Sequence, residues 1–245
     1  MADPAVAGSG VLARFLAFVV LFVACGVATV YAALNDRAGT LSVGIWRYVV
    51  VAMGTGMAYA VAGGDELLGV ASVAATTVTG IRQVLQLFFI VLISLSMREL
   101  YYRLPYHDSG STAITHGQAR LLEAAFMGIA FVEFAVVIAI GLTAAVQAVQ
   151  AVASVAFAAY GVSFAAGTRA EAMAGGTVVD GLLVRFISVL TCLGAAGVLE
   201  GTTLLGVPPA LAAGATTVFI AMSATFLLAL GVRLKANVDA VSGVS

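Results

Sequence analysis

Seven long stretches of mostly apolar residues, separated by short polar connections, dominate the chain. They cover residues 11–34, 42–63, 72–97, 120–142, 144–167, 181–204 and 208–233. A helix rises about 1.5 Å per residue, so each stretch is long enough to cross a hydrocarbon core about 30 Å thick. In lipid the backbone must satisfy its own hydrogen bonds, which a helix does within one segment. The pattern therefore predicts an all-α membrane protein with a single seven-helix transmembrane domain over residues 1–245.

The positive residues of the connections indicate an orientation. The connections after the first, third and fifth stretches and the C-terminal segment carry Arg37, Arg98, Arg103, Arg120, Arg169, Arg233 and Lys235. The three alternate connections carry neither Lys nor Arg, although the first holds Asp65 and Glu66. Cytoplasmic loops are enriched in positive residues, so we predict an outside N-terminus and a cytoplasmic C-terminus in a multi-pass protein of the cell membrane. Arg14, near the outer start of the first stretch, is expected to snorkel to the interface.

Composition narrows the possible classes of protein further. Hydrophobic residues make up 62% and charged residues 9% of the chain, and mean hydropathy is +1.11, which is typical of a membrane protein rather than a soluble domain. The N-terminus lacks the positive region of a signal peptide, so we expect no cleavage there. Cys25 and Cys192 lie inside apolar stretches, which argues against a disulfide or a zinc site. No basic block suggests nucleic-acid binding.

Charged residues inside apolar stretches are expensive in lipid and are often functional. Arg82 in the third stretch and Glu133 in the fourth lie at similar depths, so we expect them to pair across antiparallel helices. The pair could belong to a proton or ion relay, could line a water-filled cavity, or could only fix the packing of the helices. Each of these readings predicts contact between the two side chains.

Other polar or small residues inside the stretches favour helix packing. Interhelical amide hydrogen bonds account for Gln83, Gln86, Gln147 and Gln150. Gly197 and Gly201 form a GxxxG pattern that flanks Glu200, and this pattern is typical of close helix contact.

The longest connection, residues 98–119, is the best candidate for contact with a partner protein. The candidate contact residues are Tyr101, Tyr102, Arg103, Tyr106 and His107. Aromatic and arginine side chains at a headgroup surface explain the same residues without a partner. His107 and His116 are too far apart in sequence to indicate a metal site. No HExxH, GxSxG, P-loop or paired-aspartate signature is present, so we expect no enzyme activity, no metal and no cofactor.

Five short segments suggest a family. They are MAYAVAG at 57–63, RQVLQLF at 82–88, TRAEAM at 168–173, GVLEG at 197–201 and MSAT at 222–225. The second is similar to R-Y-x-D-W-L-F, the third to T-x-K-A-E-S-M, the fourth to G-x-E-G and the last to V-S-A-K. With seven helices and an outside N-terminus, the chain resembles the microbial rhodopsins, a family of retinal-binding light-driven pumps and sensors.

The chain departs from that family where retinal would bind. Thr225 occupies the position of the retinal-binding lysine, and a hydroxyl cannot form a Schiff base. Leu85 and Ala221 stand at the counterion positions, and Gln86 replaces a tryptophan of the ring-packing site. Lys235, the only lysine, lies ten residues further on, about 15 Å along a helix. The resemblance therefore implies a divergent member without covalent retinal.

Three functions remain open on the sequence. The first is a retinal-free, light-independent sensor or partner subunit, embedded in the lipid bilayer and associated with a cytoplasmic or membrane protein or with copies of itself. The second is a proton or ion pathway through the bundle that uses Arg82 and Glu133. The third is a non-covalent carrier of a hydrophobic ligand such as a carotenoid or free retinal.

Overall fold

The computed structural model describes residues 4–39, 43–69, 74–103, 115–171 and 178–242. Within these ranges the chain forms seven α-helices and one short 3₁₀ turn. They are α1 (Pro4–Arg37), α2 (Val43–Leu68), α3 (Ala75–Arg103), α4 (His116–Ile140), α5 (Ala144–Glu171), α6 (Val178–Gly201), η1 (Thr202–Leu205) and α7 (Pro209–Ser242). All seven α-helices are long and apolar enough to cross a membrane. The predicted fold class is confirmed, and the chain is a seven-helix integral membrane protein.

Several helices continue beyond the apolar stretches. We expected Glu66 in a connection, but α2 extends to Leu68 and ends where Gly69 adopts a positive φ of 62°. The Gly69 amide donates to the carbonyl of Asp65 at 2.8 Å, an arrangement that glycine permits at a helix C-terminus. Likewise Arg98 lies within α3 and not in the connection that follows it. These charged residues remain helical because they find partners inside the bundle.

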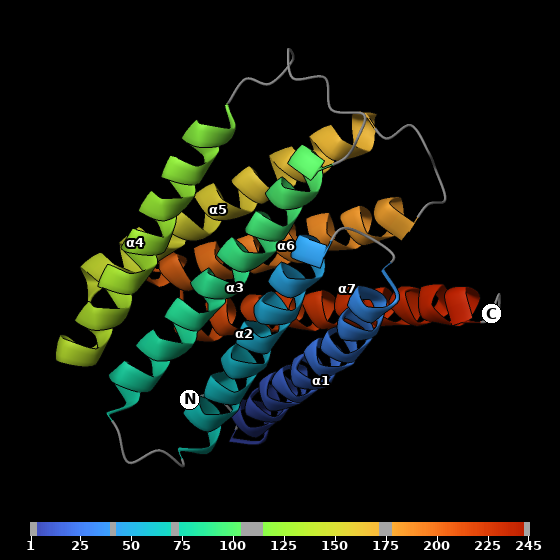
Figure 1. The fold of residues 1–245 in the computed structure, drawn as a ribbon. Coiled ribbons are helices and arrows are strands. Elements are labelled where there is room, and N and C mark those ends of the chain that lie inside the picture. The colour runs from blue at the N-terminus through green and yellow to red at the C-terminus, as the bar shows by residue number, and fades with distance from the viewer. Residues whose placement is uncertain (1–3, 40–42, 70–73, 104–114, 172–177, 243–245) are drawn as a thin grey trace.

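The helices form a closed ring with α4 on its outside. Around the ring α1 packs against α2 and α7, α2 against α3, α3 against α5, α5 against α6, and α6 against α7. Helix α3 also contacts α6 and carries most of the contacts of α4, which touches α5 only slightly (Figure 1). We call the end where α1, α3, α5 and α7 begin the predicted outer end, and the opposite end the predicted inner end.

Small residues let neighbouring helices approach closely. A Cβ atom added at Gly197 would lie 2.4 Å from Ser154 Oγ, and one added at Gly201 would lie 2.6 Å from Ala151 Cβ. These contacts join α6 to α5, so the close packing predicted for the GxxxG pattern is confirmed. Between the helices the bundle is filled by large, fully buried side chains, among them Trp46, Phe89, Phe157 and Phe186.

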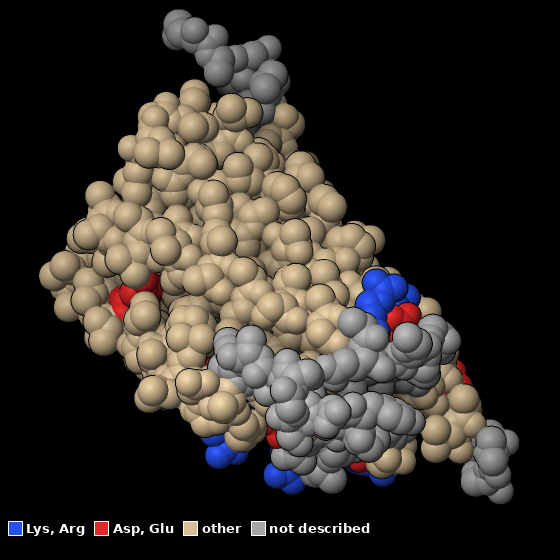
Figure 2. Space-filling view, turned by 90° about the horizontal axis from the view of Figure 1, so that it is seen from above, with Lys and Arg blue, Asp and Glu red and all other residues tan. Residues whose placement is uncertain are grey.

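The outer surface of the bundle is largely apolar. Figure 2 shows a face on which charged atoms gather mainly along one edge, while one acidic patch lies alone among uncharged side chains. Exposed aliphatic residues such as Leu121 on α4 and Val152 on α5 account for much of this surface. Contact of such an apolar surface with lipid tails is favourable, whereas its exposure to water is not.

Candidate functional site

A cluster of four charged side chains, one buried and three half-buried, lies near the predicted outer end. Arg82 of α3 is only 1% exposed. Its Nε donates a hydrogen bond to Glu66 Oε2 of α2, and its Nη1 donates to Glu200 Oε1 of α6 at 2.7 Å. The hydroxyl of Thr79 donates to the other oxygen of Glu66 at 3.0 Å. One guanidinium thus joins two carboxylates from two other helices.

Arg14 of α1 supplies the fourth charge. Its Nη2 lies 3.9 Å from Glu66 Oε2 and 4.0 Å from Glu200 Oε1. The Arg14 side chain is 16% exposed and turns toward the two carboxylates; its snorkelling to the interface stays a prediction. We name Arg14, Glu66, Arg82 and Glu200 the outer cluster. Two positive and two negative groups cancel, which is how charges are tolerated at membrane depth.

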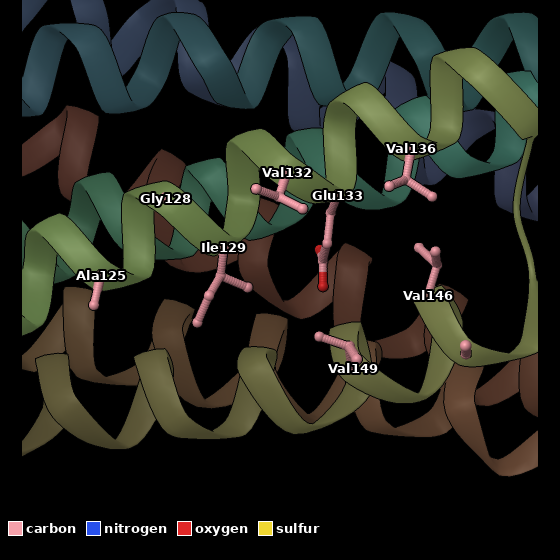
Figure 3. A pocket seen from close by; sticks show the side chains of 9 residues that line it. Ala125, Gly128, Ile129, Val132, Glu133, Val136, Val146 and Val149 are labelled. Carbon is pink, nitrogen blue, oxygen red and sulfur yellow. The ribbon is translucent and has the colours of Figure 1, made fainter.

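The predicted pair of Arg82 and Glu133 is wrong. Arg82 faces α2 and α6, whereas the Glu133 carboxylate points from α4 toward α5 near Val149 (Figure 3). Glu133 is 5% exposed, and neither of its carboxylate oxygens has a hydrogen-bond partner. The similar depth of the two residues was read correctly, but their helices turn them in different directions.

Sequence reasoning missed Glu66 as the partner of Arg82. Glu66 lies sixteen residues before Arg82, on the other side of a short connection. Glu66 lies two residues before the end of α2 and Arg82 seven residues after the start of α3, a difference in depth that their long side chains span. The sequence signal for this pairing is that both residues flank the same short connection between antiparallel helices, and a hydropathy pattern that ends the second stretch at residue 63 conceals it.

Below the outer cluster lies a layer of amide side chains. Gln86 Nε2 donates to the carbonyl of Leu193 at 2.9 Å, and Gln147 Nε2 donates to the carbonyl of Glu200 at 2.8 Å. The expectation of interhelical amide hydrogen bonds is confirmed for these two glutamines. The space that Gln86, Gln147 and Ser154 help to enclose has no room for a water molecule. The layer therefore packs helices and holds no water path.

A second group of polar side chains lies near the predicted inner end and was not foreseen. Arg98 Nε of α3 lies 3.0 Å from Glu123 Oε1 of α4, and the hydroxyl of Tyr160 of α5 donates to the same oxygen at 2.9 Å. Glu99 lies 3.5 Å from Arg98. We name Arg98, Glu99, Glu123 and Tyr160 the inner cluster. Helix α3 thus contributes an arginine to a charged cluster at each of its ends.

The predicted partner-contact residues are only partly described. Tyr101 is buried, and its ring packs 5.4 Å from that of Phe164, so it is not available as a contact residue. Tyr102 is half-buried, with its ring 4.7 Å from that of His116. Arg103 ends α3, and its side chain is not among those described. Tyr106 and His107 lie outside the described residues.

The positions taken from the rhodopsin resemblance do not surround an interior site. Thr225 is exposed on the outside of α7, where its hydroxyl donates to the carbonyl of Ala221 at 2.9 Å, and Ala221 is exposed as well. The neighbouring Ala224 faces the bundle instead. Leu85 is half-buried, and Gln86 belongs to the amide layer. The alignment in the seventh helix thus places its lysine position on the lipid side.

Comparison with known proteins identifies no family. No family model, no curated protein and no solved structure matches the chain. Among the described residues no group of three or more His, Cys, Asp or Glu side chains is arranged to hold a metal ion. Cys25 and Cys192 are both free and buried. The fold defines a seven-helix membrane protein. The two charged clusters and the amide layer are the features of its interior that bear on function.

Proposed function

We propose that the protein is a retinal-free, light-independent membrane sensor, a divergent relative of the microbial rhodopsins without enzyme activity. In this proposal the outer cluster is the input. Its carboxylates keep limited access to solvent, with 18% of the Glu66 side chain and 11% of the Glu200 side chain exposed. Protons or cations that reach these groups would weaken their bonds to Arg82.

The observation that carries the proposal is the position of α3 between the two clusters. Arg82 joins α3 to α2 and α6, while Arg98 joins it to α4. A change in charge at the outer cluster would change the relative free energies of two arrangements of α3 against its neighbouring helices. Buried charge switches in proteins act in this way. Helix α3 leads directly into the connection in which we place the partner contact, so a movement of α3 would reach a bound protein.

Transport is supported less well. Polar side chains continue inward from the outer cluster to Gln86, as a proton or ion path requires, but the amide layer there leaves no room for water. Gln86 and Ser94 are then separated by eight residues, about 12 Å along a helix. Buried apolar side chains, including Phe89, Ile90 and Ile93, occupy that interval of α3. An apolar barrier of this length opposes conduction, whereas a sensor needs only mechanical continuity through the helix.

The chain contains a natural reporter of such a movement. Trp46, the only tryptophan, is fully buried near the predicted inner end of α2, the helix that carries Glu66 at its other end. Neutralising Glu66 and Glu200 imitates the proposed input, so we expect Trp46 emission of the double variant Glu66→Gln/Glu200→Gln in nanodiscs to be shifted from that of the wild type. The double variant leaves Arg82 without its two carboxylate partners and so frees α3 to pack differently.

The controls separate a sensor from the other two functions. Replacing Glu123 by Gln tests whether the shift arises at the inner cluster instead. Added all-trans retinal should give no red-shifted band. A Schiff base at Lys235, the only lysine, would lie in solvent and not in the bundle, because Lys235 is exposed. A red-shifted band that borohydride cannot trap would favour the non-covalent carrier. A Trp46 emission that is the same in the wild type and the double variant, or that Glu123→Gln shifts equally, would overturn the proposal. Proton flux in liposomes that Arg82→Met abolishes would favour transport.

A further inference from the structure

A groove between α4 and α5 opens on the side of the bundle. Its volume is about 520 Å³, which lies within the range of small-molecule sites in proteins. The groove exists because α4 leans on α3 and touches α5 only slightly. Aliphatic side chains line it from both helices, including Ile129, Val132, Val146 and Val149 (Figure 3).

One polar side chain projects into this apolar groove. Glu133 extends from α4 toward α5, and its two carboxylate oxygens lie in the gap between the helices (Figure 3). The residue is 5% exposed, and neither oxygen has a hydrogen-bond partner. A buried carboxyl group without a partner is costly to keep, above all at membrane depth. The inner cluster shows how this chain satisfies another buried carboxylate, since Arg98 and Tyr160 both contact Glu123, and Glu133 departs from that pattern.

We propose that the groove binds a membrane-dissolved amphiphile that has one aliphatic chain and a head that donates hydrogen bonds, an alcohol or an amine. The head would bind the Glu133 carboxyl, and the chain would lie along the aliphatic walls. Glu133 is seven residues from the end of α4, about 10 Å along the helix, so the ligand enters from the bilayer. This proposal does not depend on the sensor function.

The shape of the groove favours a small molecule over a helix of another protein. Glu133 is 5% exposed, so a helix, which is about 10–12 Å wide with its side chains, could reach the carboxyl group only through a side chain inserted into the groove. A single inserted side chain would leave most of the 520 Å³ unfilled. An acyl tail without a polar head would fill the space but leave both carboxylate oxygens unpaired.

The test measures retention of dodecylamine, dodecanol and dodecane by native mass spectrometry of the delipidated full-length protein. We expect one molecule of an amine or alcohol per chain and no retention of the alkane. Glu133→Leu should weaken this retention by about tenfold or more, the size expected for a hydrogen bond to a charged or buried group. Glu133→Gln should weaken binding of the amine more than binding of the alcohol.

A second variant fills the groove without touching Glu133. A Cβ added at Gly128 meets nothing within 4 Å, so Gly128→Leu can fold and should remove binding. Gly214→Leu is the matched control, because Gly214 is an exposed glycine of α7 with the same free space, and it should bind like the wild type. Helical circular dichroism and a single elution peak establish that each variant is folded.

Each outcome decides the proposal. Binding of the amine alone identifies a cationic ligand, and binding of both amine and alcohol identifies recognition by hydrogen bonding; either supports it. Retention of neither probe, equal retention of the alkane, or unchanged binding by folded Glu133→Leu or Gly128→Leu protein overturns it. If the wild type forms dimers and Gly128→Leu does not, while amphiphile binding is unchanged, the groove contacts a second copy of the chain. That result also overturns the proposal.

Discussion

Replacing Arg82 tests whether the outer cluster is a real energetic unit. Arg82→Met keeps the aliphatic stem of the side chain but removes the charge that joins Glu66 and Glu200. Removing one partner of a buried ion pair typically costs about 3–5 kcal/mol of folding free energy. We expect about 3 kcal/mol, at the low end, because both carboxylates keep some exposure and Arg14 stays within 4.0 Å of each.

The measurement is the free energy of unfolding in mixed micelles, from reversible titration with a denaturing detergent followed by circular dichroism. Arg169→Met is the matched control. Arg169 Nε lies 2.9 Å from Asp180 Oδ1, close to the 2.7 Å between Arg82 and Glu200, but the side chains of Arg169 and Asp180 are 55% and 27% exposed. An exposed pair contributes less than about 1 kcal/mol, so burial and not distance should separate the two variants.

A triple variant distinguishes lost attraction from an unpaired buried charge. In Arg82→Met/Glu66→Gln/Glu200→Gln neutral amides replace the two carboxylates, so no unpaired negative charge remains. Most of the stability lost in Arg82→Met should therefore return. Arg14 can then reach the interface. The reasoning would be refuted if Arg82→Met lost no more stability than Arg169→Met. It would also be refuted if the triple variant were as unstable as Arg82→Met.

Two further predictions concern packing and the inner cluster. Gly161→Ala should destabilise the protein by about 1–3 kcal/mol, because the added Cβ would lie 2.3 Å from Ser94 Oγ. The control Gly214→Ala adds a Cβ that meets nothing within 4 Å, so it should be neutral or slightly stabilising in the same detergent titration. Tyr160→Phe removes the donor 2.9 Å from Glu123 and should cost about 1 kcal/mol; an unchanged unfolding free energy would show that the hydroxyl contributes nothing to the inner cluster.

The charged residues show where prediction from sequence reached its limit. Arg82 and Glu133 were both recognised as intramembrane charges, and their similar depths were correct, yet they do not meet. Glu66 was set aside because hydropathy falls at the end of α2, although the helix continues for two more residues. A hydropathy pattern finds where apolar residues stop, and it carries no information on where a helix stops.

The same limit explains the seventh helix. Thr225 and Ala224 are adjacent in sequence, but successive residues of an α-helix point about 100° apart, since one turn takes 3.6 residues. One therefore faces lipid and the other faces the bundle. A short resemblance between apolar helices cannot settle which of the two positions is inside.

By itself the sequence determined the class of the protein, the number of membrane-spanning helices and the similar depths of Arg82 and Glu133, but it misplaced Glu66 and Arg98. These properties are local, because hydropathy is summed over one segment and depth follows from a fixed rise per residue. Only the tertiary structure decided which side chains meet, since that depends on the rotation of every helix about its own axis and on its neighbours. Packing turns Arg82 toward α2 and α6, where two carboxylates bind it, and turns Glu133 into a groove that α4 and α5 leave open.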